Sequence, residues 1–171
     1  YAGVDVYGDW LIYDEDGRII PIAEGTDADK TVTGNGMPWF TGSLTTKVRW
    51  KSFDASIALR SALGFEIFNV HDFYYGLQSM NTNLLTSAYA RNAAVIKGRN
   101  VITDYFLEPG DYLKLDCVSV GWTHKFNWKY IENLRVFLTA SNLYTFTRFT
   151  GVDPSTYPVN GMTPGTYGGN I

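Results

Sequence analysis

Two long stretches in which apolar and polar residues alternate constrain what this chain can fold into. One runs from Tyr112 to Phe126 and the other from Leu134 to Phe146. Strands of globular domains usually contain about 5–6 residues, whereas a tilted strand that crosses a bilayer needs about 9–11. Strands of this length, with two chemically different faces and aromatic ends, are typical of a barrel wall that sits in lipid.

An earlier hairpin has the same period. Residues 39–69 alternate on either side of a short turn at 51–53, which indicates a half-buried pair of strands. The apolar parity of the strands, which should face lipid in a membrane barrel, includes Leu44, Val48, Ile57, Leu59, Val120, Val136 and Leu138. The polar parity, which should face the lumen, includes Thr45, Lys47, Ser56, Arg60, Arg135 and Thr139.

The connections between the strands alternate strictly between long and short. Residues 1–38, 70–111 and 147–171 are long, whereas 51–53 and 127–133 are short. Outer-membrane barrels pair short periplasmic turns with long extracellular loops. We therefore expect an all-β chain, part of a large up-and-down antiparallel transmembrane barrel with about four membrane strands here. The three long connections should lie outside the cell, and this chain alone should not close the barrel.

Local signals refine this outline. Asp14-Glu15-Asp16-Gly17 predicts the turn of a small hairpin, and residues 84–96 are compatible with one short helix. A change of parity near Asp116-Cys117 predicts a bulge, or a strand whose upper part leaves the bilayer. Aromatic residues at the short-turn end are Trp50, Phe53, Phe126, Trp128 and Tyr130. Those at the other end are Phe65, Phe68, Tyr112, Tyr144 and Phe146.

Composition narrows the classes of function. With 45% hydrophobic and 18% charged residues the chain is not of disordered type, and a net charge of -3 without a basic block disfavours nucleic acid as a partner. Cys117 is the single cysteine, and His71 and His124 lack metal-ligand spacing, so neither a metal nor a cofactor is expected. No apolar run approaches the roughly 18 residues of a transmembrane helix.

Candidate binding residues fall into two groups. One is the aromatic run within the long connection 70–111, formed by Phe73, Tyr74 and Tyr75. Exposed aromatic rings are natural stacking surfaces for sugars, so this run is a candidate substrate site. The alternative is that these rings pack the loop against its neighbours. Four strand cations share the polar parity and are candidates for lining a wet lumen, where they could tune the passage of an anionic solute: Lys47, Arg49, Arg60 and Arg135.

Catalytic and metal readings find less support. Asp14-Glu15-Asp16-Gly17 does not continue into the ligand pattern of a calcium-binding EF-hand, so a hairpin turn is favoured. His71 and Asp72, near Ser79 and Ser87, are not accompanied by a nucleophile signature such as Gly-x-Ser-x-Gly. A surface histidine is therefore favoured, and we expect no catalytic residues.

A series of motifs resembles one known family in order and spacing. They are Gly34-Asn35-Gly36-Met37-Pro38, Phe53-Asp54-Ala55-Ser56, the run Tyr105–Leu115 continuing through Val120-Gly121-Trp122-Thr123, Leu134-Arg135-Val136 through Asn142-Leu143-Tyr144-Thr145-Phe146-Thr147, and Gly151-Val152-Asp153-Pro154. Over nearly its whole length the chain resembles the C-terminal barrel segment of SusC/RagA-type TonB-dependent outer-membrane transporters.

This resemblance implies a plugged barrel of roughly 22 strands in the bacterial outer membrane, which is not an enzyme. Such transporters import oligosaccharides or peptides with TonB-coupled energy, beneath a surface lipoprotein lid of the SusD type. In the family the plug and the TonB box lie near the N-terminus, and the final barrel strand usually ends at a C-terminal aromatic residue. We expect none of these three features within residues 1–171. The rest of the barrel, the plug, the TonB complex and the bilayer are the implied partners.

Two other functions fit the same alternation. A secreted β-sandwich that binds carbohydrate would also explain the aromatics, although it usually has shorter strands and shorter loops. A passive porin would differ by lacking a plug, which only residues upstream of Tyr1 could decide.

Overall fold

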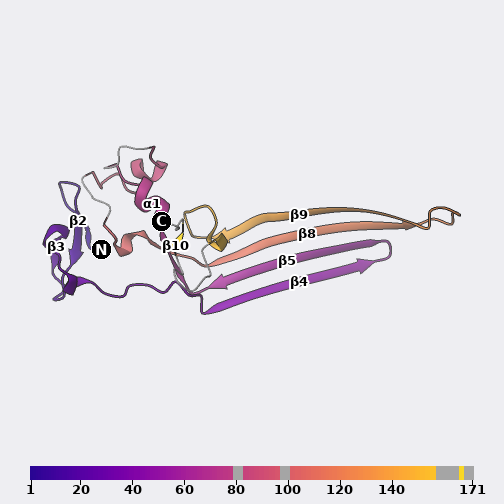
Figure 1. Cartoon of the computed structure of the whole chain (residues 1–171), viewed down its shortest axis with the longest axis horizontal. Coiled ribbons are helices and arrows are strands. Elements are labelled where there is room, and N and C mark those ends of the chain that lie inside the picture. Colours follow the sequence, from indigo (N-terminus) through magenta and orange to yellow (C-terminus); the bar gives the residue numbers. More distant parts are fainter. Residues whose placement is uncertain (79–82, 97–100, 157–165, 168–171) are drawn as a thin grey trace.

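A four-stranded antiparallel sheet dominates the chain. In a computed structural model that describes all residues except 79–82, 97–100, 157–165 and 168–171, the strand order is β4-β5-β8-β9 (Figure 1). These strands are β4 (Phe40–Trp50), β5 (Phe53–Leu63), β8 (Tyr112–Lys125) and β9 (Asn133–Thr147). Each pairs antiparallel with the next, which confirms the predicted up-and-down order.

The strands are long enough to cross a bilayer. β4 and β5 contain 11 residues each, and β8 and β9 contain 14 and 15. At about 3.3 Å per residue, even the shorter pair rises about 36 Å. The hydrocarbon core of a bilayer is about 30 Å thick, so a tilted strand of this length spans it.

The pairing register separates the two predicted parities onto opposite faces. Leu44 lies opposite Leu59, and Val120 opposite Leu138, so the residues predicted to face lipid share one face, whereas Phe137 pairs with Gly121 on the other. Ser56 lies opposite both Lys47 and Ser119 on the other face. The parity assignment made from the sequence is therefore confirmed, and we call these surfaces the apolar face and the polar face.

A bulge explains the change of parity in β8. Ala58 pairs with Cys117 but Leu59 pairs with Leu115, so Asp116 is an extra residue relative to β5. β9 shifts at the same level, where Asn142 has a left-handed φ of 54°, a conformation that asparagine adopts more readily than most residues. Of the two predicted explanations the bulge is correct. It returns Leu115 to the apolar face.

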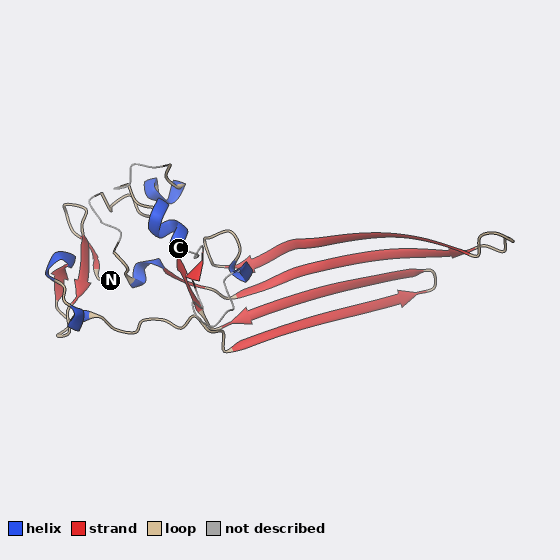
Figure 2. Cartoon of the chain, viewed as in Figure 1, coloured by secondary structure: helices blue, strands red, loops and turns tan. Residues whose placement is uncertain are grey.

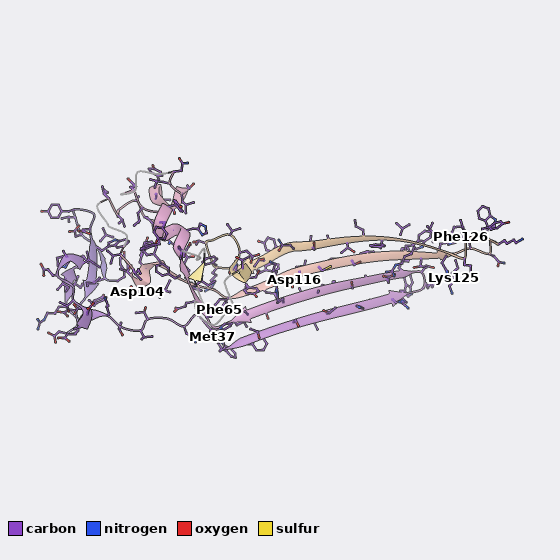
Figure 3. The ribbon with its side chains drawn as sticks, in the orientation of Figure 1. Met37, Phe65, Asp104, Asp116, Lys125 and Phe126 are labelled. Atoms are coloured by element: carbon purple, nitrogen blue, oxygen red, sulfur yellow. The ribbon has the colours of Figure 1, made fainter. Side chains whose placement is uncertain are left out.

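Both hairpins turn at the end of the sheet labelled by Lys125 and Phe126 (Figure 3). Lys51 and Ser52 join β4 to β5, and Lys51 has a φ of 53°, as the first central residue of a primed turn requires. The β8–β9 connection is held at its base by a 2.9 Å hydrogen bond from Phe126 N to Glu132 O.

The remaining described residues gather beyond the other end of the sheet (Figure 2). We call the described residues of 1–38, 64–111 and 148–167 the loop assembly. It contains a sheet of β1 (Gly3–Val4), β2 (Trp10–Tyr13) and β3 (Ile19–Pro21), and a sheet of β6 (Glu66–Asn69), β7 (Leu107–Pro109) and β10 (Thr166–Tyr167). Its helical turns are η1 (Ile22–Glu24), η2 (Asp27–Asp29), α1 (Val70–Tyr75), η3 (Thr86–Tyr89), η4 (Asp104–Phe106) and η5 (Pro154–Thr156).

Two local predictions in this region have different outcomes. The hairpin at Asp14–Gly17 is confirmed, because β2 and β3 pair across it and Gly17 has a φ of 78°. The helix predicted over residues 84–96 is wrong. That stretch holds only the 3₁₀ turn η3, and its Ser87 and Asn92 turn their side chains to buried groups instead. The α-helix lies earlier, at α1, where Asn69 caps the N–H of Asp72.

An aromatic core joins distant segments of the loop assembly. Trp10 of β2, Phe73 of α1 and Phe106 of η4 are buried together with Leu77 and Val95. Phe106 meets Phe73 edge to face at 5.3 Å and Trp10 at 5.8 Å between ring centroids. The described parts of residues 1–38 and 70–111 therefore share one aromatic core.

The segment after β9 folds back over the polar face. Lys114 is buried there, and its Nζ donates to Asp153 Oδ2 at 2.6 Å and to Ser155 Oγ at 2.9 Å. Phe149 packs with Ala62 and Tyr112 of the same face. Burial by itself would raise the pKa of Asp153, but hydrogen bonds from Lys114 and Ser155 outweigh it and hold the pKa below its ordinary value.

Replacing Phe106 with alanine should loosen the loop assembly, because large-to-small changes of a buried Phe typically cost about 3–5 kcal/mol. We expect limited proteolysis of the full-length protein to cut the loop assembly of this variant faster, while the long strands stay protected. Ile102→Ala is the matched control, since Ile102 is 78% exposed. Equal cleavage of both variants and the parent would contradict the packing role of Phe106.

Asp153 should anchor residues 148–156 in a pH-dependent way. A carboxyl whose folded pKa is depressed contributes stability above its unfolded pKa of about 3.9, and that contribution is lost as pH falls through the folded pKa. Asp153→Asn should therefore remove amide-exchange protection from residues 148–156 at neutral pH. Asp27→Asn, in an exposed pair with Lys30, should change nothing there. Parent-like protection in Asp153→Asn would show that the ion pair does not hold the segment.

Candidate functional site

The polar face of the sheet carries the predicted lumen-lining cations. β4, β5 and β9 contribute them, and the pairing register puts all of them on that one face: Lys47, Arg49, Arg60 and Arg135. This face is therefore chemically distinct from the apolar face behind it, and it could bind or guide a polar solute.

Ion pairs organise part of this face. Arg135 Nη2 contacts Asp54 Oδ2 at 2.7 Å, and Arg60 Nε contacts Asp116 Oδ2 at 3.1 Å. Gly121 lies between Asp54 and Arg135, and a Cβ there would sit only 2.8 Å from both carboxylate oxygens of Asp54. Glycine at this position lets the Asp54 side chain lean across β8, a role that the alternation pattern could not reveal.

A shallow hollow of about 430 Å³ lies on this face near the turn end of the sheet. All four strands contribute side chains to it. Its lining residues are Lys47, Val48, Arg49, Asp54, Ala55, Ser56, Ser119 and Arg135. Three of the four predicted lumen cations are thereby brought together, whereas Arg60 lies away from them beside the bulge at Asp116.

The three residues of the predicted aromatic run, Phe73, Tyr74 and Tyr75, differ in their exposure to solvent. Phe73 is 7% exposed and forms part of the aromatic core, and Tyr74 packs against that core. Tyr75 is 45% exposed. Phe73 therefore packs the loop against its neighbours, which was the alternative to substrate binding. Of the three rings, Tyr75 has the most surface open to a solute.

A buried polar network connects the segments of the loop assembly. Arg91 bridges two buried carboxylates, with Nη2 at 2.6 Å from Asp72 Oδ2 and Nη1 at 3.0 Å from Glu108 Oε1. Asn92, also buried, donates to Asp72 at 3.1 Å and accepts from the Tyr105 hydroxyl at 2.6 Å. Burial alone would lower the pKa of Arg91, but the two carboxylates hold it above its ordinary value.

Glu108 extends this network to the segment after β9. It accepts a hydrogen bond from the backbone N–H of Thr150 at 2.8 Å and from the Asn69 side chain at 3.1 Å. No sequence pattern predicts a role for Arg91, Asn92 or Glu108. Only the run containing Glu108-Pro109-Gly110-Asp111 marked this region, and it did so through the resemblance.

Ser87, the described serine near His71 and Asp72, has a structural role. The Ser87 hydroxyl donates a hydrogen bond to Asp72, which also accepts hydrogen bonds from Arg91 and Asn92. Ser79 lies outside the described residues. Within the described ranges no group of three or more His, Cys, Asp or Glu could hold a metal ion. None of the described helices is long and apolar enough to cross a membrane.

Two curated proteins to which the chain is similar are TonB-dependent receptors. No family model matches the chain. TonB-dependent receptor SusC of Bacteroides thetaiotaomicron is 26% identical over 174 residues, covering 90% of this chain and 17% of SusC. TonB-dependent receptor P3 of Formosa agariphila is 28% identical over 159 residues, covering 86% of this chain and 15% of P3. The chain thus spans under a fifth of the length of these curated relatives.

Solved structures agree on the fold. The RagAB peptide importer in its closed-closed state matches 90% of this chain and 19% of its own with a TM-score of 0.70 at 20% identity. The open-open state matches 98% of this chain and 20% of its own with a TM-score of 0.65 at 18% identity. The antiparallel sheet corresponds to part of a TonB-dependent receptor barrel, and its described residues do not close one.

The resemblance found in the sequence motifs is therefore confirmed by two curated relatives and by the fold. TonB-dependent receptors reside in the bacterial outer membrane and are transporters, not enzymes. The chain is homologous to a segment of the SusC/RagA-type TonB-dependent receptors.

Proposed function

We propose that this chain forms part of the barrel wall of a TonB-dependent importer, with its apolar face toward lipid and its polar face toward the lumen. The observation that carries the proposal is the bare apolar face. Large side chains on all four strands lie in the open, with Leu138 76% exposed. A soluble protein rarely leaves so extended an apolar surface in water, whereas a bilayer solvates it.

The alternatives explain less of the geometry. A β-sandwich would cover the apolar face with a second sheet about 10 Å away. Among the described residues, Phe149 and Asp153 instead cover the polar face, through Tyr112 and Lys114. A passive porin would share the wall, but the similarity to TonB-dependent receptors favours active import.

Aromatic residues support this orientation. Trp50, Phe53 and Trp128 are exposed at the turn end, and Tyr144 and Phe146 are exposed at the loop end. Such rings suit the two headgroup regions of a bilayer. Three aromatic residues that the sequence placed at the loop end do not belong to this exposed set: Phe65 and Tyr112 are buried in one cluster with Phe149, and Phe68 packs against the aromatic core.

The loop assembly then lies outside the cell. On this view residues 1–38, 70–111 and 147–171 are extracellular, the turns at 51–53 and 127–133 are periplasmic, and the chain is the C-terminal part of the barrel. The segment around Asp153 folds over the polar face and would narrow the mouth of the lumen. The hydrogen bond of Thr150 to Glu108, and the aromatic core shared by residues of 1–38 and 70–111, support a preformed surface for solute capture and lid contact.

Substrate and partners follow from the relatives. The solved structures are named for a peptide importer, so an oligopeptide is one supported solute class, and an oligosaccharide is the other that the exposed ring of Tyr75 suits. We infer that a SusD-type lipoprotein caps the barrel. The plug, the remaining strands and the contact with the TonB complex would come from parts of the protein outside this chain.

Arginine placed on the two faces should separate lipid from lumen. Leu59→Arg, near the middle of β5 on the apolar face, should cost about 2–4 kcal/mol in barrel assembly, because the charge would meet hydrocarbon. Thr45→Arg, at a similar height on the polar face, should cost little. The measurement is the heat-modifiable gel shift of the full-length receptor in outer membranes. Equal loss of assembly in the two variants would refute the orientation.

Tyr75 should contribute to solute capture through its ring. Tyr75→Ala should lower receptor-dependent uptake about 2- to 10-fold, which matches the usual worth of one aromatic contact, whereas Tyr75→Phe should retain most of it. Tyr89→Ala is the control, since Tyr89 is also exposed, at 68%, but belongs to η3 and not to α1. Unchanged uptake in Tyr75→Ala at normal surface levels would remove Tyr75 from the site.

A further inference from the structure

We propose that the hollow on the polar face is an oxyanion site, in which Lys47, Arg49 and Arg135 bind a carboxylate or a chemically similar group. The proposal deepens the proposed function and rests on the polar face lining the lumen. The carboxylate could belong to an acidic solute in transit or to an acidic side chain from another part of the same protein. The chemistry of recognition is the same for both sources.

Two adjacent rows of paired residues build the site. One row runs from Lys47 through Ser56 and Ser119 to Thr139, and the next runs from Arg49 through Asp54 and Gly121 to Phe137. Paired strands lie about 4.8 Å apart, and alternate residues of one strand rise about 7 Å, so a small anion can touch both rows at once. Residues of both rows line the hollow.

The charge of the site is not balanced. Lys47, Arg49 and Arg135 contribute three positive charges and Asp54 one negative charge, which leaves +2 among the lining residues. Asp54 is held by Arg135, and neither Lys47 nor Arg49 has an ion-pair partner among the residues that the structure describes. Two uncompensated cations beside a hollow draw in anions, and a planar guanidinium matches a carboxylate in a bidentate way.

The cations nearer the loop end of the same face differ in this respect. Arg60 is paired with Asp116 at 3.1 Å, and Lys114 with Asp153 at 2.6 Å. Arg60 and Lys114 thus each have a carboxylate partner within this chain. Among the described residues, the lack of a carboxylate partner therefore distinguishes Lys47 and Arg49 at the hollow from Arg60 and Lys114 elsewhere on the polar face.

Neutral groups complete the site. Gly121 leaves the space over which Asp54 reaches toward Arg135, so Asp54 positions the guanidinium beside the hollow. Ser56 lines the hollow, and the hydroxyls of Ser119 and Thr139 form a 2.9 Å hydrogen bond next to it. Hydroxyl donors stabilise an oxyanion without adding charge.

The test uses crystals of the full-length receptor, grown without sulfate or phosphate and soaked in sodium selenate, whose selenium is located by anomalous scattering. Selenate between Lys47, Arg49 and Arg135 would support a site open to an acidic solute. An acidic side chain of another segment seated there would support the same chemistry with an internal source. A site that holds neither would overturn the proposal, and this arm needs no variant.

A variant pair measures the contribution of the cations. Lys47→Met combined with Arg49→Gln should weaken selenate binding about tenfold or more, since it removes two charge-assisted contacts. Lys51→Met is the control, because Lys51 lies at the same end but stacks on Trp50. Where selenate occupies the site in the parent protein, equal selenate binding in both variants would overturn the proposal. The same crystals show which face meets detergent, so failure of the membrane orientation is seen separately from failure of the site.

Discussion

The hydrogen-bonded register of the four long strands is the constraint on which the rest of the structure depends. Side chains alternate with a period of two, so a slip of one residue would move every apolar side chain to the other face. β8 carries one residue too many to keep its parity, and the bulge at Asp116 absorbs it. Without that bulge Leu115 would leave the apolar face. The clean separation of the faces therefore rests on one irregular residue as much as on the regular pattern.

The same backbone groups explain why this sheet needs further strands if it stands in lipid. The outer edges of β4 and β9 have no strand partner among the described residues. Hydrocarbon offers no hydrogen-bond partners, so an open edge at membrane depth costs several kcal/mol per unpaired group. A chain that spans under a fifth of its relatives is consistent with neighbours supplied by the rest of the protein.

Sequence predicted what local periodicity controls and missed what long-range packing controls. The four strands, their order, the Asp-Gly hairpin and the bulge all follow from alternation and turn residues. The position of the helix, the burial of Phe73 and the inward packing of Phe65 do not, because each depends on partners far along the chain. The Arg91 network is the clearest case, since it joins carboxylates 19 and 17 residues away. Nothing in the sequence near Arg91 marks such partners.

The two ends of the polar face show how burial decides the fate of a charge. At the loop end Lys114 is covered, and an unpaired buried cation would cost so much that Asp153 must accompany it. At the turn end Lys47 and Arg49 remain open to water, where a lone cation is tolerated and stays available for a ligand. The loop assembly thus uses its charges to fix its own shape. On the exposed part of the polar face Lys47 and Arg49 have no ion-pair partner among the described residues. If this face lines the lumen, the charges of the loop assembly would hold a rigid entrance, and the unpaired cations below it would remain available to bind a solute.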